Sequence, residues 1–485
     1  MVEAVRPGPG PRTLRTARAI LQLTAAEVVG KLGTLAVVVG AARLLPLPDF
    51  GVFSVALGVG AIVAVLPSWG FDTILIQRGA SRPQALPTLL AELLALRLAF
   101  AAGTLAAVAG VVAGAGATLA VTAAVSCVVT ACLAETVTEA YRAVAVAAER
   151  PGIVARTQLL QRAATAALAL AALAVWRGLL PLAVAYLAGT LVGTAAAAAG
   201  AGQLGVRPRW AGVSWSGAGR LFRASWPAGA HSVASMALFR CDAVLLAALA
   251  GAAAAGRYAA AYRLLETVVF VSWTVARAVF PVMASTRDAW RVRRGADRGV
   301  VVLAAVFLPY AALLWCRGGD LLRLLYGEPF VGPGLPVVAW LAPAPLLFGA
   351  AFLAADVLLS AGPTGTVLVG SIGALAVNLG LNLVLIPRYG PTGAAMATSA
   401  SYAVELALLY PPACRRVGRP TLVRPLLPVV AGSALLAGVL LLPLPLSPAL
   451  AAGAVGYLAV WYALARRLDP EQVRVLRGLT ARRPA

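Results

Sequence analysis

Five residues with helical spacing form the most chemically informative pattern in this sequence. Arg263, Glu266, Phe270, Trp273 and Arg277 follow one another at intervals of three, four, three and four residues. At about 100° per residue they share one face of a helix. Guanidinium groups bind phosphate through paired hydrogen bonds, and aromatic rings can stack on the faces of sugars. This face is therefore typical of a site for an anionic, sugar-bearing ligand.

A second interpretation of the same face needs no ligand. Arg263 and Glu266 are one helical turn apart and could form an ion pair, while Arg277 could extend to the membrane interface. An ionisable side chain at the centre of a bilayer costs at least about 2.5 kcal/mol, so each must be buried in protein or reach water. Both interpretations satisfy that condition, and the sequence leaves them open.

Other charged residues within apolar stretches are further candidate binding residues. Arg240 and Asp242 stand two positions apart, roughly 200° around a helix, so one of them is expected to pack against a neighbouring helix. Lys31 follows Glu27 by four residues, a spacing that favours mutual neutralisation. The further candidates are Arg97 and the acids Glu92, Glu135, Glu139, Asp356 and Glu405. The sequence contains no catalytic constellation, metal-ligand spacing or cofactor motif, so no enzyme activity, metal or cofactor is predicted.

The elements that position these residues are predicted to be membrane-spanning helices. Of the 485 residues, 61% are hydrophobic and 12% are charged, a composition unlike that of soluble domains. Each spanning segment must satisfy its own backbone hydrogen bonds, so the predicted fold class is an all-α polytopic membrane protein. Apolar windows of about twenty residues predict fourteen spans, at 24–45, 51–70, 88–112, 116–138, 153–176, 180–203, 226–249, 258–282, 299–317, 335–360, 364–386, 392–411, 425–443 and 448–466.

Arginine is concentrated in every second loop between these spans. Such loops are expected on the cytoplasmic side of the cell membrane, so both termini are predicted to be cytoplasmic. The net charge of +22 is explained by this orientation and by anionic lipid headgroups, so nucleic acid is not an expected partner. The predicted organisation has six segments: a cytoplasmic N-terminal segment 1–22, a six-helix bundle 23–203, an interfacial linker 204–225, a second six-helix bundle 226–412, two additional helices 413–466 and a basic cytoplasmic tail 467–485.

Several short stretches, taken in order, resemble the bacterial polysaccharide flippases. They are DFGVFS at 49–54, SWP at 225–227, RCD at 240–242, GRYAAAYR at 256–263, FP at 280–281, LYGEPF at 325–330 and IPRYGPTGAA at 386–395. The sequence is similar in this respect to the multidrug/oligosaccharidyl-lipid/polysaccharide exporter superfamily. The resemblance implies two pseudo-symmetric six-helix bundles around a central cavity, and it carries over individually to only two cavity candidates, Asp242 and Arg263.

The resemblance also implies a function. It implies a flippase that moves a polyprenyl-pyrophosphate-linked oligosaccharide across the cytoplasmic membrane by alternating access. The implied partners are the lipid-linked glycan, membrane lipids and proteins of glycan synthesis and polymerisation. A multidrug or cation antiporter is the alternative within the superfamily, and it would favour acids facing an apolar cavity. A membrane-embedded glycan polymerase or ligase is disfavoured by the short external loops, and a non-transporting scaffold should tolerate loss of every cavity charge.

Overall fold

The computed structural model describes residues 30–69, 71–213, 219, 222, 226–362 and 365–470, which form helices joined by short loops. The chain packs as two compact units, unit 1 with residues 1–240 and unit 2 with residues 241–485. Helix α9, Trp226–Ala250, contains the boundary between them. Within the described ranges no residue is in a strand, which confirms the predicted all-α fold class.

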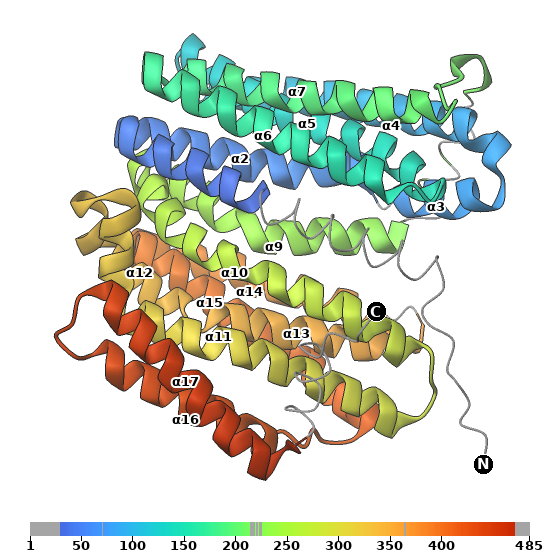
Figure 1. Cartoon of the computed structure of the whole chain (residues 1–485). Coiled ribbons are helices and arrows are strands. Elements are labelled where there is room, and N and C mark those ends of the chain that lie inside the picture. The colour runs from blue at the N-terminus through green and yellow to red at the C-terminus, as the bar shows by residue number, and fades with distance from the viewer. Residues whose placement is uncertain are drawn as a thin grey trace, which may run out of the picture. The chain divides into compact units, whose positions relative to one another are not determined.

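Unit 1 is built around one central helix, α5. This helix contacts α2, α3, α4, α6 and α7 (Figure 1). A helical stretch at 30–44 precedes them. The elements are α2 Leu47–Ser68, α3 Phe71–Ser81, η1 Pro83–Ala85, α4 Leu86–Gly114, α5 Leu119–Ala147, α6 Pro151–Trp176, α7 Leu179–Gln203 and η2 Trp210–Gly212.

Unit 2 is centred on α10 and α11. Helix α10 contacts α11, α12, α13 and α15, whereas α16 and α17 pair with each other and lie against α11 (Figure 1). The elements are α10 Ala252–Ala284, α11 Ala289–Tyr326, η3 Glu328–Phe330, α12 Val331–Leu341, α13 Ala344–Leu359, α14 Gly365–Tyr389, α15 Pro391–Val417, α16 Val423–Leu440 and α17 Leu446–Leu468.

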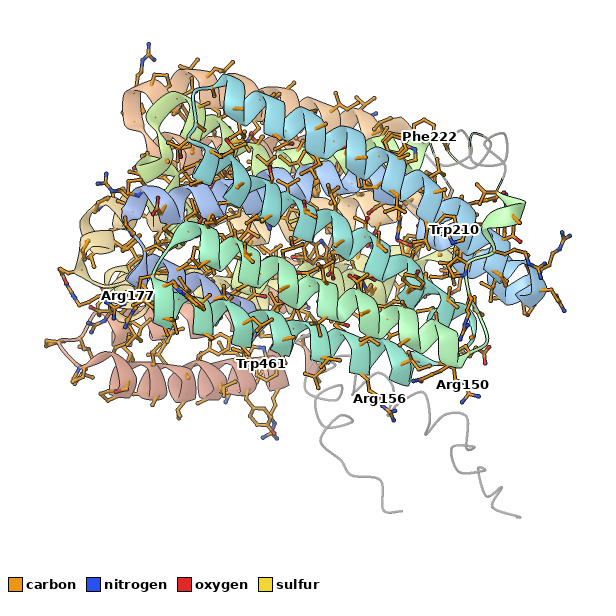
Figure 2. The ribbon with its side chains drawn as sticks, turned by 90° about the horizontal axis from the view of Figure 1, so that it is seen from above. Arg150, Arg156, Arg177, Trp210, Phe222 and Trp461 are labelled. Atoms are coloured by element: carbon orange, nitrogen blue, oxygen red, sulfur yellow. The ribbon has the colours of Figure 1, made fainter. Side chains whose placement is uncertain are left out.

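Every predicted span overlaps a helix of the structure, and the chain is a multi-pass membrane protein. Among the described residues twelve helical stretches are long and apolar enough to cross a membrane. The stretch 30–44 and α15 are not among the twelve, so the predicted number of fourteen is not confirmed. Figure 2 shows Arg150 and Arg156 at one end of unit 1 and Arg177 at the other. The arginine-rich and arginine-poor turns of α6 therefore lie at opposite ends of that helix.

Two helix breaks occur in unit 2, and one of them lies at a proline. The predicted span 335–360 is two helices, α12 and α13, separated at Ala342 and Pro343. Proline lacks an N–H group and obstructs the preceding turn, so it ends a helix or begins one. A second break lies at Arg317 inside α11, where φ is −134° and ψ is 19°.

The Arg317 side chain joins α11 to the last two helices of unit 2 through hydrogen bonds. Its Nε donates to the carbonyl of Leu440 at 2.6 Å, and its Nη2 donates to the carbonyls of Leu442 at 2.6 Å and Leu444 at 3.0 Å. The last carbonyls of a helix have no partner within that helix. Arg317 therefore caps the C-terminal end of α16 and the turn into α17.

Glycine allows a close contact between α6 and α7 in unit 1. A Cβ atom on Gly189 of α7 would lie 2.3 Å from the Cα of Thr165 on α6, and one on Gly193 would lie 2.2 Å from the Cγ of Gln161. This pair of glycines, spaced as in a GxxxG motif, lets the two backbones approach. Another motif of this kind is formed by Gly110 and Gly114, and a Cβ atom added to either of them would meet no atom within 4 Å.

We expect Gly189→Ala to destabilise the protein by about 1–3 kcal/mol, because the added methyl group overlaps backbone atoms of Thr165 that cannot rotate away. Gly110→Ala is the matched control, since it makes the same chemical change in open space and should be neutral or slightly stabilising. The measurement is the thermal stability of both variants in detergent. Equal Tm values for the two would contradict this account of the α6–α7 contact.

Candidate functional site

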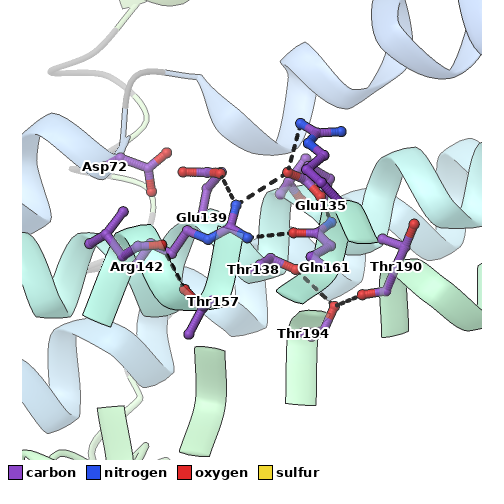
Figure 3. A network of polar contacts seen from close by, with 12 residues as sticks. Asp72, Glu135, Thr138, Glu139, Arg142, Thr157, Gln161, Thr190 and Thr194 are labelled. Atoms are coloured by element: carbon purple, nitrogen blue, oxygen red, sulfur yellow. Dashed lines mark hydrogen bonds and ion pairs between the residues drawn. The ribbon is translucent and has the colours of Figure 1, made fainter. Parts of the chain in front are cut away.

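A network of charged side chains lies between α5 and α6 in unit 1. Its centre is Arg142, whose side chain is only 4% exposed. The Nη1 of Arg142 donates to the Oε1 of Glu139 at 2.6 Å and to the Oε1 of Glu135 at 3.3 Å. Its Nη2 donates to Gln161, and the amide nitrogen of Gln161 donates in turn to Glu135 (Figure 3).

Two further arginines lie near this network, and together with it they form what we call the arginine cluster: Arg142, Arg162 and Arg240 with Glu135, Glu139 and Gln161. The Nη2 of Arg162 lies 3.7 Å from the Oε1 of Glu135, and the Arg162 side chain is 36% exposed. Arg240 and Arg162 both lie within electrostatic range of the Cys132 thiol, as does Glu135. Among the described residues the three guanidinium groups of the cluster outnumber its two carboxylates, while Asp72, which also acts on Glu139, is paired with Arg97, so the cluster can attract an anion.

Helix periodicity explains how the cluster forms. Glu135, Glu139 and Arg142 are spaced four and three residues apart, which places them on one face of α5. On α6, Gln161 reaches this face because Gly193 of α7 leaves room for its side chain. The same spacing was available in the sequence, where it was the one signal for this site.

The sequence interpretation did not include three members of the cluster, Arg142, Arg162 and Gln161, among its candidates. Arg142 lies beyond the end of the predicted span 116–138, whereas Arg156 and Arg162 lie inside the predicted span 153–176. In the structure α5 continues to Ala147 and α6 begins at Pro151, so only residues 148–150 separate the helices. The predicted span 116–138 therefore ended too early, because α5 continues through Glu139 and Arg142, whose charges find partners in the cluster.

The predicted face of α10 is present in unit 2 and contains the ion pair of the second interpretation. Arg263 Nη1 and Glu266 Oε2 are 2.6 Å apart, with side chains 18% and 11% exposed. Trp273 contacts Phe348 of α13 edge-on at 6.4 Å between ring centroids. Phe270 is partly exposed and Arg277 is exposed, and no ion pair with Arg277 occurs among the described residues.

A buried carboxylate forms a second polar centre in unit 2. Asp242 is 1% exposed. Its Oδ1 accepts a hydrogen bond from Asn382 at 2.6 Å, and its Oδ2 accepts one from Tyr258 at 3.2 Å and another from Thr398. Asn378 is also buried and bonds to Asn382 at 2.9 Å. The expectation that one of Arg240 and Asp242 packs against neighbouring helices agrees with this arrangement of Asp242.

The surroundings of Asp242 restrict what the carboxylate can do. Within the described part of the chain no cationic side chain contacts it, and an isolated buried charge is costly. Uptake of a proton or of a small cation would neutralise it, and the neighbouring amide and hydroxyl oxygens are the ligands that hard cations prefer. Among the described residues, those around Asp242 included, no group of three or more acidic, cysteine or histidine side chains could hold a metal ion.

Arg97 is fully enclosed in unit 1, at 0% exposed. Its Nη2 lies 2.8 Å from both carboxylate oxygens of Asp72, its Nε donates to the carbonyl of Pro67 at 3.2 Å, and its Nη1 donates to the carbonyl of Thr136. The guanidinium thus joins the end of α2 to α3 and α5, which favours a structural role. Lys31 is exposed near the start of the 30–44 helix, and Glu27 lies outside the described residues.

Solved structures share this fold over most of its length. The lipid II flippase MurJ, in an inward closed conformation, matches with a TM-score of 0.74 at 11% identity, covering 92% of this chain and 99% of that chain. An inward-facing multidrug resistance MATE family transporter of the MOP superfamily matches with a TM-score of 0.68 at 13% identity, covering 82% and 98%. A MOP superfamily transporter from Pyrococcus furiosus matches with a TM-score of 0.61 at 15% identity, covering 82% and 95%.

These likenesses show the fold of flippases and transporters of the MOP superfamily, as the sequence resemblance predicted. No curated protein matches the chain by sequence. The sequence model of the family described as polysaccharide biosynthesis protein matches residues 41–332, which is more than half of the chain. That stretch includes the arginine cluster, Asp242 and the α10 face. The chain therefore belongs to this polysaccharide biosynthesis protein family.

Proposed function

We propose that the protein is a flippase that moves a polyprenyl-pyrophosphate-linked oligosaccharide across the cytoplasmic membrane by alternating access. The observation that carries the proposal is the arginine cluster, in which three guanidinium groups outnumber two carboxylates within membrane helices of unit 1. Charges inside membrane helices are costly and mark substrate pathways. A pyrophosphate is the part of such a substrate that guanidinium groups bind best.

The members of the cluster have different roles in this proposal. Arg142 is a positioning residue, because its Nη1 and Nη2 are bonded to Glu135, Glu139 and Gln161. Arg162 and Arg240 are less enclosed and bind the pyrophosphate. Glu135 holds Arg162 while the site is empty, and the weak 3.7 Å contact is easily exchanged for phosphate. The polyprenyl chain stays in lipid, and both termini are cytoplasmic.

A second candidate function is a multidrug or cation antiporter. It is favoured by Asp242, because a buried carboxylate with no cationic partner among the described residues suits the binding of a coupling ion in ion-coupled exchange. The same carboxylate could couple an ion gradient to glycan transport, so it does not by itself separate the two functions. The excess of guanidinium over carboxylate groups in the arginine cluster favours an anionic substrate over a cationic drug.

The face of α10 provides the experiment, since Arg277 is exposed and Arg263 is paired with Glu266. We expect Arg277→Ala to reduce substrate affinity roughly ten- to hundredfold, the effect of one charge-assisted phosphate contact, at unchanged abundance in the membrane. Arg277→Lys should restore part of the activity through its charge. The measurement is glycan export by cells, normalised to the amount of protein in the membrane.

The ion pair needs its own control variant. Arg263→Ala leaves Glu266 without its ion-pair partner and should lower the amount of protein in the membrane. The double variant Arg263→Ala/Glu266→Ala should restore that amount. If export stays low in that recovered double variant, Arg263 also binds substrate. Normal export by a well-expressed Arg263→Ala/Arg277→Ala variant would remove α10 from the substrate path and contradict this part of the proposal.

A further inference from the structure

A cavity of about 480 Å³ lies at one end of unit 1, apart from the arginine cluster. It is lined by Tyr141 of α5, by the last turns of α7 including Gly202 and Gln203, and by Arg207 and Pro208 beyond them. Its volume is within the range of roughly 300–1,000 Å³ that is typical of small-ligand pockets. A phenol, an amide and a guanidinium group therefore line a space large enough for a small polar group.

The backbone around Arg207 is held on both sides. Val206 is buried in the hydrophobic core that contains Leu86 and Leu90, and the N–H of Arg209 donates to the carbonyl of Pro87 at 2.9 Å. Arg207 itself is exposed, and no carboxylate lies within ion-pair distance of it in the described part of the chain. Its charge is thus presented at the cavity by a fixed loop.

Backbone hydrogen bonds at the C-terminal end of α7 reduce its repulsion of a negative group. A helix C-terminus normally repels anions through its last carbonyls. Here the carbonyl of Ala201 accepts from Leu204 and Val206, and that of Gly202 accepts from Gly205. These bonds satisfy two of the last carbonyls of α7, and Arg207 is the one charged residue among those that line the cavity.

The position of the cavity indicates the source of the ligand. Trp210 is 53% exposed and lies at the same end of unit 1 as Arg150 (Figure 2). Exposed tryptophan beside arginine is typical of the membrane–water interface, and basic pockets between membrane helices bind lipid headgroups. We propose that this cavity binds the phosphate headgroup of an anionic membrane phospholipid through Arg207, Tyr141 and Gln203.

Native mass spectrometry of the detergent-purified protein tests the proposal with dioleoylphosphatidylglycerol as the probe. Dioleoylglycerol, which has the same chains without phosphate, is the matched lipid. We expect the wild-type protein to retain the phospholipid and not the dioleoylglycerol. Arg207→Ala should weaken retention about tenfold or more, because one charge-assisted contact is lost, whereas Arg209→Ala should not change it.

A second variant fills the cavity without changing its charge. A Cβ on Gly202 would meet nothing within 4 Å, so Gly202→Leu should fold normally and displace the headgroup. Gly152→Leu, also in open space but away from the cavity, is its control. Wild-type retention by Arg207→Ala or by Gly202→Leu would overturn the proposal, as would equal retention of the two lipids. Displacement of the lipid by millimolar inorganic phosphate would overturn the assignment to a phospholipid and indicate a site for free anions.

Discussion

Replacing Arg97 with alanine is expected to destabilise the protein by about 3–5 kcal/mol, the cost of breaking a buried ion pair by removing one partner. The change leaves the Asp72 carboxylate without its cation and the carbonyls of Pro67 and Thr136 without a donor. Each of these groups lies at a junction of helices, so the loss should be cooperative. The measurement is Tm in detergent together with the amount of folded protein in the membrane.

The control variants for Arg97 distinguish charge from geometry. Arg97→Lys should recover little, because an ammonium group cannot reproduce the planar fork that reaches a carboxylate and two carbonyls. Arg97→Met/Asp72→Leu removes both charges and should be more stable than Arg97→Ala. Arg156→Ala removes an exposed arginine of α6 and should change stability by no more than about 0.5 kcal/mol. A stable Arg97→Ala protein with impaired transport would instead assign Arg97 to the substrate site.

The double variant Arg162→Ala/Arg240→Ala is expected to have the largest effect on transport. Each arginine supplies about 1.5–3 kcal/mol if it makes one charge-assisted bond to pyrophosphate, so the two together correspond to roughly a hundred- to ten-thousandfold loss of affinity. Arg142, Glu139 and Gln161 remain bonded to one another in this variant. We therefore expect wild-type abundance with glycan export at background.

A contrasting variant within the same network tests the division of roles. Arg142→Ala leaves Glu139 and Glu135 without their closest cation, so it should lower abundance before it lowers transport per molecule. If Arg162→Ala/Arg240→Ala lowers abundance as strongly as Arg142→Ala, the cluster is a structural network and the proposed binding role is wrong.

Local rules in the sequence predicted much of the fold. The spans 180–203 and 448–466 were located to within a few residues. An apolar run between charged turns forms a helix in lipid, because a helix satisfies the backbone hydrogen bonds of the segment internally. These local rules did not predict which helices pack against each other. Gly189 and Gly110 begin identical motifs, yet only Gly189 packs against another helix, and the difference depends on tertiary neighbours absent from either segment.

The candidate site was predictable where its spacing lay within one helix. The α10 face, including the Arg263–Glu266 pair, follows from intervals of three and four residues. The partners of Asp242 lie on three other helices, with Asn382 and Thr398 far away in sequence. Arg142 lay outside the predicted span 116–138 and Arg162 inside the predicted span 153–176, and no spacing within one helix relates these two residues. The arginine cluster could be seen only once α5 and α6 were placed together.

The central claim is tested most directly by reconstituting the purified protein into vesicles loaded with a polyprenyl-pyrophosphate-linked oligosaccharide in both leaflets. The fraction of glycan reached by an impermeant glycosidase is then measured with time. The account predicts that wild-type protein exposes nearly all of the glycan and that Arg162→Ala/Arg240→Ala vesicles expose only the outer-leaflet half. Suppose instead that wild-type vesicles expose only that half and accumulate a cationic drug when an ion gradient is imposed. This result would contradict the account and identify an antiporter.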